Sequence, residues 1–280
     1  MRYGFVIPQG EIHEIAELAH EAEESGWDGV FYWDGIYIQG WNEIYDPWVT
    51  LAAMALRTER VRLGAMLTPP ARRRPWKLAR ETVSVDRLSN GRLVLPVGLG
   101  TVDDGGFSLV GEPTDRRTRA ELLDESLAIL TGLWSGEPFA YHGRHYQMET
   151  MTFRPTPVQR PRIPIWVVGA WPRAKSMARA LRYDGLLPYK LNPDGSGAEI
   201  APADIAAMRD YIAEQRQETT PYDIVWEGRT PGDDPAAAAA QLRPFVEAGL
   251  TWWIEAMWSA PNDVADIRLR IRQGPPRVEA

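Results

Sequence analysis

Cysteine is absent from the 280-residue sequence, and this absence excludes several kinds of site. Without cysteine the chain forms no disulfide, has no thiolate nucleophile and cannot build a zinc or iron–sulfur centre on cysteine ligands. Any redox chemistry that the protein performs therefore requires a bound cofactor.

Long apolar runs and an excess of positive charge are also lacking. No apolar stretch reaches the length of a membrane span, and the apolar run near the N-terminus is too short for the core of a signal peptide. The formal net charge is −7, and the arginines are dispersed apart from Arg72, Arg73 and Arg74. Because such a charge repels phosphate backbones, we expect no nucleic-acid partner. From the lack of a membrane-spanning run and of a signal-peptide core, we expect a cytoplasmic protein with no membrane partner.

The sequence does contain a regular alternation of short apolar runs, rich in β-branched and aromatic residues, with longer stretches of helical periodicity. This alternation predicts βα units on a parallel sheet. The predicted strands are Tyr3–Ile7, Gly29–Trp33, Val61–Leu67, Leu93–Val97, Ile163–Val168, Gly185–Tyr189, Asp223–Trp226 and Trp252–Met257. The predicted helices are Ile12–Ser25, Pro47–Arg57, Trp76–Leu88, Arg119–Trp134, Arg173–Tyr183, Pro202–Gln217, Pro235–Ala248 and Asn262–Gln273.

Eight strand–helix pairs in this length favour an α/β fold of the closed (β/α)₈ TIM-barrel type, with residues 1–280 as a single domain. Residues Glu137–Thr156 interrupt the alternation and predict a hairpin excursion before the fifth strand. In such a barrel, function lies at the carboxyl ends of the strands. The residues at the predicted strand ends are aromatic, glycine-rich and poor in titratable groups, which suits a flat apolar cofactor better than a hydrolytic site.

Seven segments in order along the chain carry a resemblance to a known family. They are Tyr3–Pro8, Gly26–Asp34, Asp46–Pro47, Thr58–Gly64 with its continuation through Thr68–Pro69 to Arg74–Pro75, Asp86–Arg92, Leu133–Pro138, and Pro155–Gln159 with Ile163–Gly169. On these segments the sequence resembles the luciferase-like monooxygenases and the deazaflavin-dependent reductases that share their fold. The resemblance implies a flavin or deazaflavin ring over the third strand, beside a non-prolyl cis peptide near Met66–Leu67, with the phosphate arm near the loops after strands four and five. The cofactor-binding residues that it predicts are Met66, Leu67, Thr68, Gly98, Gly100, Gly169, Ala170, Trp171 and Arg173.

The sequence departs from the luciferase branch of this family at three positions. The phosphate-binding arginine of that branch aligns with Leu99, and its hydroxyl side chains align with Trp171 and Ala174. The loss of these phosphate contacts favours coenzyme F420 over FMN. Arg173 and the helix N-terminus that follows Trp171 remain as a candidate phosphate site.

A further departure concerns proton transfer. Many relatives carry a histidine where this chain has Gly35. The four histidines are His13, His20, His142 and His145; we interpret them as surface or packing residues, and we predict no metal site.

Candidate reactive residues lie at the predicted strand ends. Trp33 and Trp171 are predicted pocket walls, and Asp34 is a candidate proton acceptor whose alternative role is to cap the following loop. Glu227 and Glu255 are predicted to face one cavity as a carboxylate pair, with ion pairs to arginine as the alternative, and Trp258 is predicted to contact substrate. Arg72–Arg74 are interpreted as a solvated basic rim rather than a site for an anionic cofactor tail.

Three functional hypotheses follow. The first is an F420-dependent oxidoreductase that transfers a hydride to or from a small organic substrate. The second is an FMN-dependent monooxygenase that uses O₂ and a flavin reductase partner. The third is a degenerate flavin-binding barrel without turnover, motivated by Gly35 and Leu99. In each case we expect a homo-oligomer.

Overall fold

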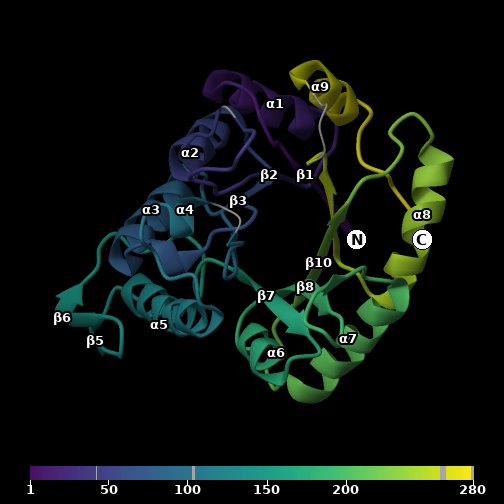
Figure 1. Cartoon of the computed structure of the whole chain (residues 1–280). Coiled ribbons are helices and arrows are strands. Elements are labelled where there is room, and N and C mark those ends of the chain that lie inside the picture. The colour runs from purple at the N-terminus through teal and green to yellow at the C-terminus, as the bar shows by residue number, and fades with distance from the viewer. Residues whose placement is uncertain (42, 103–104, 259–262, 279–280) are drawn as a thin grey trace.

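The strands form a closed parallel barrel in the computed structural model, which describes residues 1–41, 43–102, 105–258 and 263–278 (Figure 1). The strand order is β3-β2-β1-β11-β10-β8-β7-β4. Parallel bridges join Leu63 to Leu93 and Thr68 to Val97, so β3 and β4 close the ring. The (β/α)₈ TIM-barrel prediction is therefore confirmed.

The barrel strands coincide with the predicted ones to within a few residues. They are β1 (Arg2–Val6), β2 (Gly29–Tyr32), β3 (Arg62–Ala65), β4 (Leu95–Val97), β7 (Ile165–Trp171), β8 (Gly185–Leu191), β10 (Asp223–Gly228) and β11 (Trp252–Ala256). A two-residue strand, β9 (Gly197–Ala198), adds to the edge of β8.

Helices surround the barrel (Figure 1). They are α1 (Ile12–Glu24), α2 (Pro47–Arg57), α3 (Pro75–Leu88), α4 (Gly105–Ser108), α5 (Arg116–Trp134), α6 (Ala174–Ala180), α7 (Pro202–Gln215), α8 (Pro235–Ala248) and α9 (Val264–Arg272), with the short 3₁₀ helix η1 (Pro70–Arg72). The predicted first residue of α9, Asn262, lies outside the described residues. Among the residues that the structure describes, no helix is both long and apolar enough to cross a membrane.

The barrel interior is filled by side chains rather than open as a pore. Phe31, Trp166 and Trp252 are each at most 2% exposed, and the ring centroids of Trp166 and Trp252 lie 5.3 Å apart. Val6, Met66, Leu187, Val225 and Ile254 belong to the same buried cluster. Since this cluster fills the interior, only the layer at the carboxyl ends of the strands is left to hold a ligand.

The predicted excursion is present as the antiparallel hairpin of β5 (Pro138–His142) and β6 (Gln147–Thr152), which projects beside α5 (Figure 1). The carboxylate of Glu125, on α5, accepts hydrogen bonds from the backbone N–H groups of Arg144, His145 and Tyr146. Gly143 is required in this turn because an added Cβ would lie 2.4 Å from Oε2 of Glu125. One acidic side chain therefore fixes the hairpin to the barrel's outer helices.

Candidate active site at the barrel mouth

The alternation of side chains along each strand decides which residues reach the barrel mouth. Neighbouring strand residues point to opposite faces, and positions two apart share a face. Val225 belongs to the interior cluster, so Glu227, two positions further on along β10, faces the mouth. By the same rule, the side chains of residues next to the inward-facing ones lie in the layer between the strands and the helices.

The end of β3 forms an apolar wall, as the family resemblance predicts. The peptide bond between Met66 and Leu67 is cis, so the predicted non-prolyl cis peptide is confirmed. Thr68 is fully buried, and its hydroxyl has no hydrogen-bond partner among the described residues. A buried unpaired hydroxyl is energetically costly unless a ligand supplies the missing partner.

Two predicted glycines belong to the neighbouring loop after β4. A Cβ added at Gly98 would lie 2.8 Å from Val168 and 3.1 Å from Leu67, so the backbone approaches the β3 wall closely. Gly100 has a φ of +74°, which favours glycine. The guanidinium of Arg119 donates to the carbonyl oxygens of Leu99 and Gly100 at 3.1 and 2.9 Å. Arg119, which the sequence did not single out, therefore stabilises the backbone of this loop.

Trp33 explains why position 35 is glycine. Its ring is 5% exposed, and its Nε1 donates to the carbonyl oxygen of Pro8 at 2.7 Å. A Cβ added at Gly35 would lie 2.2 Å from Cζ3 of Trp33. The Trp33 ring therefore occupies the space into which a side chain at position 35 would extend, including the histidine of many relatives.

The solvated basic rim predicted for Arg72–Arg74 is wrong for its first two members. The Asp34 side chain is fully buried and forms ion pairs with Arg72 at 3.2 Å and with Arg73 at 2.9 Å. Arg73 binds both carboxylate oxygens, and only Arg74 is exposed. Both oxygens of Asp34 are thus occupied by guanidinium groups, which favours its alternative role of fixing the loop after β2 and leaves its predicted catalytic role without geometric support.

The predicted pair of Glu227 and Glu255 does not form. Glu255 is fully buried on the outer face of β11, where it accepts hydrogen bonds from Thr230, Trp253 and Arg270. Its predicted contact with substrate is therefore wrong, because the carboxylate instead joins the loop after β10 to α9. The outer-face position of Glu255 follows from strand alternation. The sequence alone did not reveal it, because the predicted end of the strand was uncertain by a residue.

Glu227, in contrast, is half-buried on the inner face of β10. Its Oε1 accepts a hydrogen bond from Nε1 of Trp258 at 3.3 Å. Burial raises the pKa of the Glu227 carboxyl above its usual range, and the Trp258 hydrogen bond offsets part of that rise. The barrel mouth thus holds a carboxyl group that is protonated more readily than a solvated one, and a carboxyl group of this kind can take part in proton transfer.

The predicted cofactor contacts on β7 have mostly packing roles. A Cβ at Gly169 would lie 2.3 Å from Leu186 and 2.9 Å from Met177, so Gly169 faces α6. Trp171 packs edge-on against Tyr211 of α7 at 5.5 Å, which removes it from the predicted pocket wall. The alternating pattern of β7 points Ala170 toward the mouth, and Arg173 is exposed just before α6. The role of both in cofactor binding stays a prediction.

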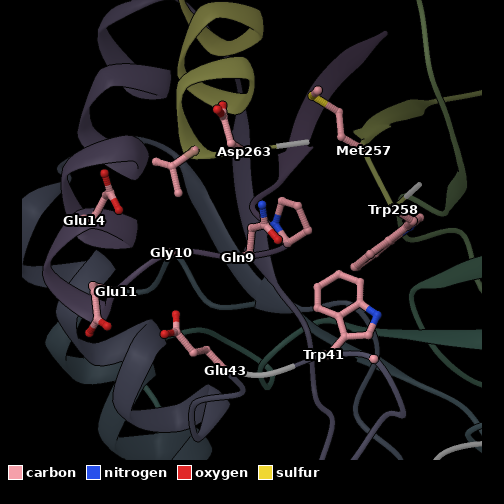
Figure 2. A pocket seen from close by; sticks show the side chains of 12 residues that line it. Gln9, Gly10, Glu11, Glu14, Trp41, Glu43, Met257, Trp258 and Asp263 are labelled. Atoms are coloured by element: carbon pink, nitrogen blue, oxygen red, sulfur yellow. The ribbon is translucent and has the colours of Figure 1, made fainter. Parts of the chain in front are cut away.

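A cavity of about 620 Å³ opens beside the mouth. Figure 2 shows Trp41 and Trp258 on one side and Glu11, Glu14 and Glu43 on the other, with Gln9 between them and Asp263 at the start of α9. Trp33 contacts both indoles, with ring centroids 5.0 Å from Trp41 and 6.3 Å from Trp258. Of these lining residues the sequence indicated Gln9 and Trp258, which lie at predicted strand ends, whereas no motif marks Trp41 or the acidic residues.

Three of the four histidines, His20, His142 and His145, lie on α1 and on the hairpin, away from the mouth. Nε2 of His145 lies 2.9 Å from Glu121, and Nδ1 of His142 lies 3.1 Å from Gln147. His20 lies near Glu23 and Glu24 on α1, and the Glu23 carboxylate already accepts hydrogen bonds from the backbone N–H groups of residues 59–61.

Comparison with known proteins identifies the family. Residues 2–273 match the luciferase-like monooxygenase family. The chain belongs to this family. Among relatives of the luciferase-like chain, an F420-dependent glucose-6-phosphate dehydrogenase from Nakamurella multipartita is 32% identical over 254 residues, which cover 85% of this chain and 71% of the relative.

Solved structures agree in fold. The monooxygenase RslO1 from Streptomyces bottropensis superimposes with a TM-score of 0.80 at 20% identity, over 98% of this chain and 97% of its own. The coenzyme F420-dependent tetrahydromethanopterin reductase from Methanopyrus kandleri gives a TM-score of 0.76 at 16% identity, over 98% of both chains. This luciferase-like barrel is therefore shared by proteins that use different chemistry.

Proposed function

We propose that this luciferase-like protein is an F420-dependent oxidoreductase that transfers a hydride between the deazaflavin and a small organic substrate. One observation carries the proposal: the wall of Met66, Leu67 and Thr68 at the carboxyl end of the barrel includes a buried hydroxyl that has no hydrogen-bond partner among the described residues. The tricyclic ring of a flavin or deazaflavin has an apolar face and a polar edge, so it would cover the wall and supply a partner for Thr68. Gly98 lets the loop after β4 pack directly against this wall, because a Cβ there would lie 2.8 Å from Val168 and 3.1 Å from Leu67.

The choice of F420 over FMN rests on charge at the phosphate end. Leu99 replaces the arginine expected in the luciferase branch, and Arg119 near it donates to two backbone carbonyls. The name of the 32%-identical relative supports the same choice. Arg173 and Lys175, both exposed after β7, would attract the long anionic tail of F420, which the shorter FMN lacks.

The residues at the mouth would divide the work as follows. When bound, the deazaflavin supplies the hydride acceptor or donor. Trp33 and Trp258 exclude water from one side of the mouth, and Glu227 would take or return the substrate's proton at its Oε2, which has no hydrogen-bond partner among the described residues. Glu227 thereby provides the proton-transfer group that the histidine at position 35 provides in many relatives.

Titration of the purified protein with F420 and with FMN, by calorimetry at two salt concentrations, tests the proposal. We expect F420 to bind at least about tenfold more tightly than FMN, a difference of about 1.4 kcal/mol. The reason is that the FMN phosphate would lack the arginine partner that it has in the luciferase branch. Leu67→Arg should abolish binding while the barrel remains folded by circular dichroism. Equal or tighter binding of FMN would overturn the assignment and favour a monooxygenase that needs O₂ and a reductase partner.

A further inference from the structure

The cavity beside the barrel mouth has walls of two kinds. Its volume of about 620 Å³ lies within the range of small-molecule sites. On one side the half-buried indoles of Trp41 and Trp258 are both supported by the Trp33 ring. The opposite side carries carboxylates, and none of the described residues that line the cavity is basic (Figure 2). Its occupant must therefore suit both an aromatic surface and a negative potential.

The negative potential persists after the partners of the carboxylates are counted. Glu11 accepts a hydrogen bond from the Tyr45 hydroxyl, which leaves its charge in place. Asp263 caps α9, and the N-termini of α1 and α9 each contribute roughly half a positive charge. Arg268 lies 3.5 Å from Glu14. Four carboxylates against one guanidinium and two helix termini leave the cavity negative.

The arrangement of the carboxylates argues against an inorganic ion. Within the described residues, only His20, Glu23 and Glu24 bring three candidate ligand atoms within 4.8 Å of one another. The carboxylates of the cavity are spread around its wall, whereas a divalent cation needs oxygen ligands that converge on one point. A bulky cation with diffuse charge needs no such convergence, and indole faces attract it directly.

We propose that this cavity binds an organic cation, such as a substituted ammonium group, through Trp41 and Trp258 with Glu43 as a lining carboxylate that has no hydrogen-bond or ion-pair partner among the described residues. On the proposed function, this cation is part of the substrate. The cavity adjoins Trp258, which also donates to Glu227, so a substrate anchored there extends toward the carboxyl that would transfer its proton.

Choline and its uncharged carbon analogue 3,3-dimethylbutan-1-ol are the probes for this site. Calorimetric titration of the cofactor-free full chain should show choline binding about tenfold more tightly than the analogue, because the two differ in charge but hardly in shape. The affinity for choline should fall as salt rises.

Two pairs of variants locate the site. Trp41→Leu should weaken choline binding about tenfold, whereas Trp76→Leu, at a half-buried tryptophan on α3, should leave it unchanged. Glu43→Gln should weaken it about threefold, whereas Glu247→Gln on the exposed face of α8 should not. Circular dichroism verifies that each variant is folded.

Equal affinity for choline and its analogue, or equal effects in both members of a variant pair, would overturn the proposal. Tight binding of Ca²⁺ or Mg²⁺ that is lost in Glu43→Gln would overturn it in favour of a metal site. Because the titrations contain no cofactor, choline binding would stand even if F420 failed to bind, and F420 binding would stand if choline failed.

Discussion

Asp34 and its two arginines form the most buried ion-pair group at the barrel mouth. The Asp34 and Arg72 side chains are at most 1% exposed. Asp34→Asn would remove the carboxylate charge that Arg72 and Arg73 share, leaving Arg73 with Glu81 at 4.0 Å, and we expect it to lower the free energy of unfolding by about 3–5 kcal/mol. Urea denaturation followed by circular dichroism measures this.

Asp124→Asn is the matched control, because Asp124 also pairs with two arginines, Arg179 and Arg182, but is 40% exposed. It should cost about 1 kcal/mol or less. If Asp34→Asn instead kept its stability and lost only turnover, Asp34 would be the proton acceptor that the sequence predicts.

A substitution at Thr68 should affect cofactor affinity without lowering the stability of the fold. Thr68→Val removes a buried hydroxyl that has no hydrogen-bond partner among the described residues, so stability should stay equal or rise. Cofactor affinity should fall about tenfold, which corresponds to one lost hydrogen bond of about 1–1.5 kcal/mol.

The control at this position is Thr82→Val. The hydroxyl of Thr82 is equally buried, but it donates to the Leu78 carbonyl at 2.8 Å and accepts from Trp134 at 3.2 Å. This variant should lose about 1–3 kcal/mol of stability and bind cofactor normally. A Thr68→Val protein with unchanged cofactor affinity would remove the ring from the β3 wall.

Glu227 gives the protein a defined pH dependence. Because burial raises the pKa of Glu227 in the folded state, the folded protein retains this proton over a range where the unfolded chain has released it. Stability from this group is complete below the unfolded pKa and is lost as pH rises through the folded pKa. Glu227→Gln should therefore match the wild type near pH 4 and have a higher Tm at pH 7–8. Thermal melts across this range check the sign, and parallel curves would contradict it.

At the scale of single elements, the hairpin of β5 and β6 depends on one side chain of α5. Glu125→Gln weakens the acceptor for three backbone N–H groups, so amide hydrogen exchange at residues 144–146 should accelerate about tenfold, equivalent to about 1.4 kcal/mol. Glu121→Gln is the control, because Glu121 contacts the side chains of Arg117, Arg144 and His145. Exchange that accelerates equally in both variants would show that the charge of α5, and not the hydrogen bonds from the backbone to Glu125, stabilises the hairpin.

The elements also show how far sequence reasoning reaches. The strands and helices of the barrel follow from periodicity, because each strand is a continuous apolar run bounded by polar turns. The faces of the strand ends do not follow, since a one-residue uncertainty in a strand end reverses the side to which a residue points. Glu255 and Trp171 were misplaced for this reason, and Glu227 was placed at the mouth.

Side-chain pairing between loops was the other missing information. Nothing in the run Arg72–Arg74 indicates that two of its guanidinium groups turn inward to Asp34, because the partner lies 38 residues away. The cavity acids Glu11, Glu43 and Asp263 come from three separate loops. Only the closed barrel brings these loops together.

For the whole molecule, closure has a consequence during synthesis. β1 hydrogen-bonds to β11, whose partner residues lie 250 positions away, as in Arg2 with Trp252. Until β11 leaves the ribosome, β1 and β10 each present a row of unpaired backbone groups that can join another chain. Chaperone demand should therefore be greatest for nascent chains that end between β10 and β11. It should fall once β11 pairs with both neighbours and the barrel has no open edge.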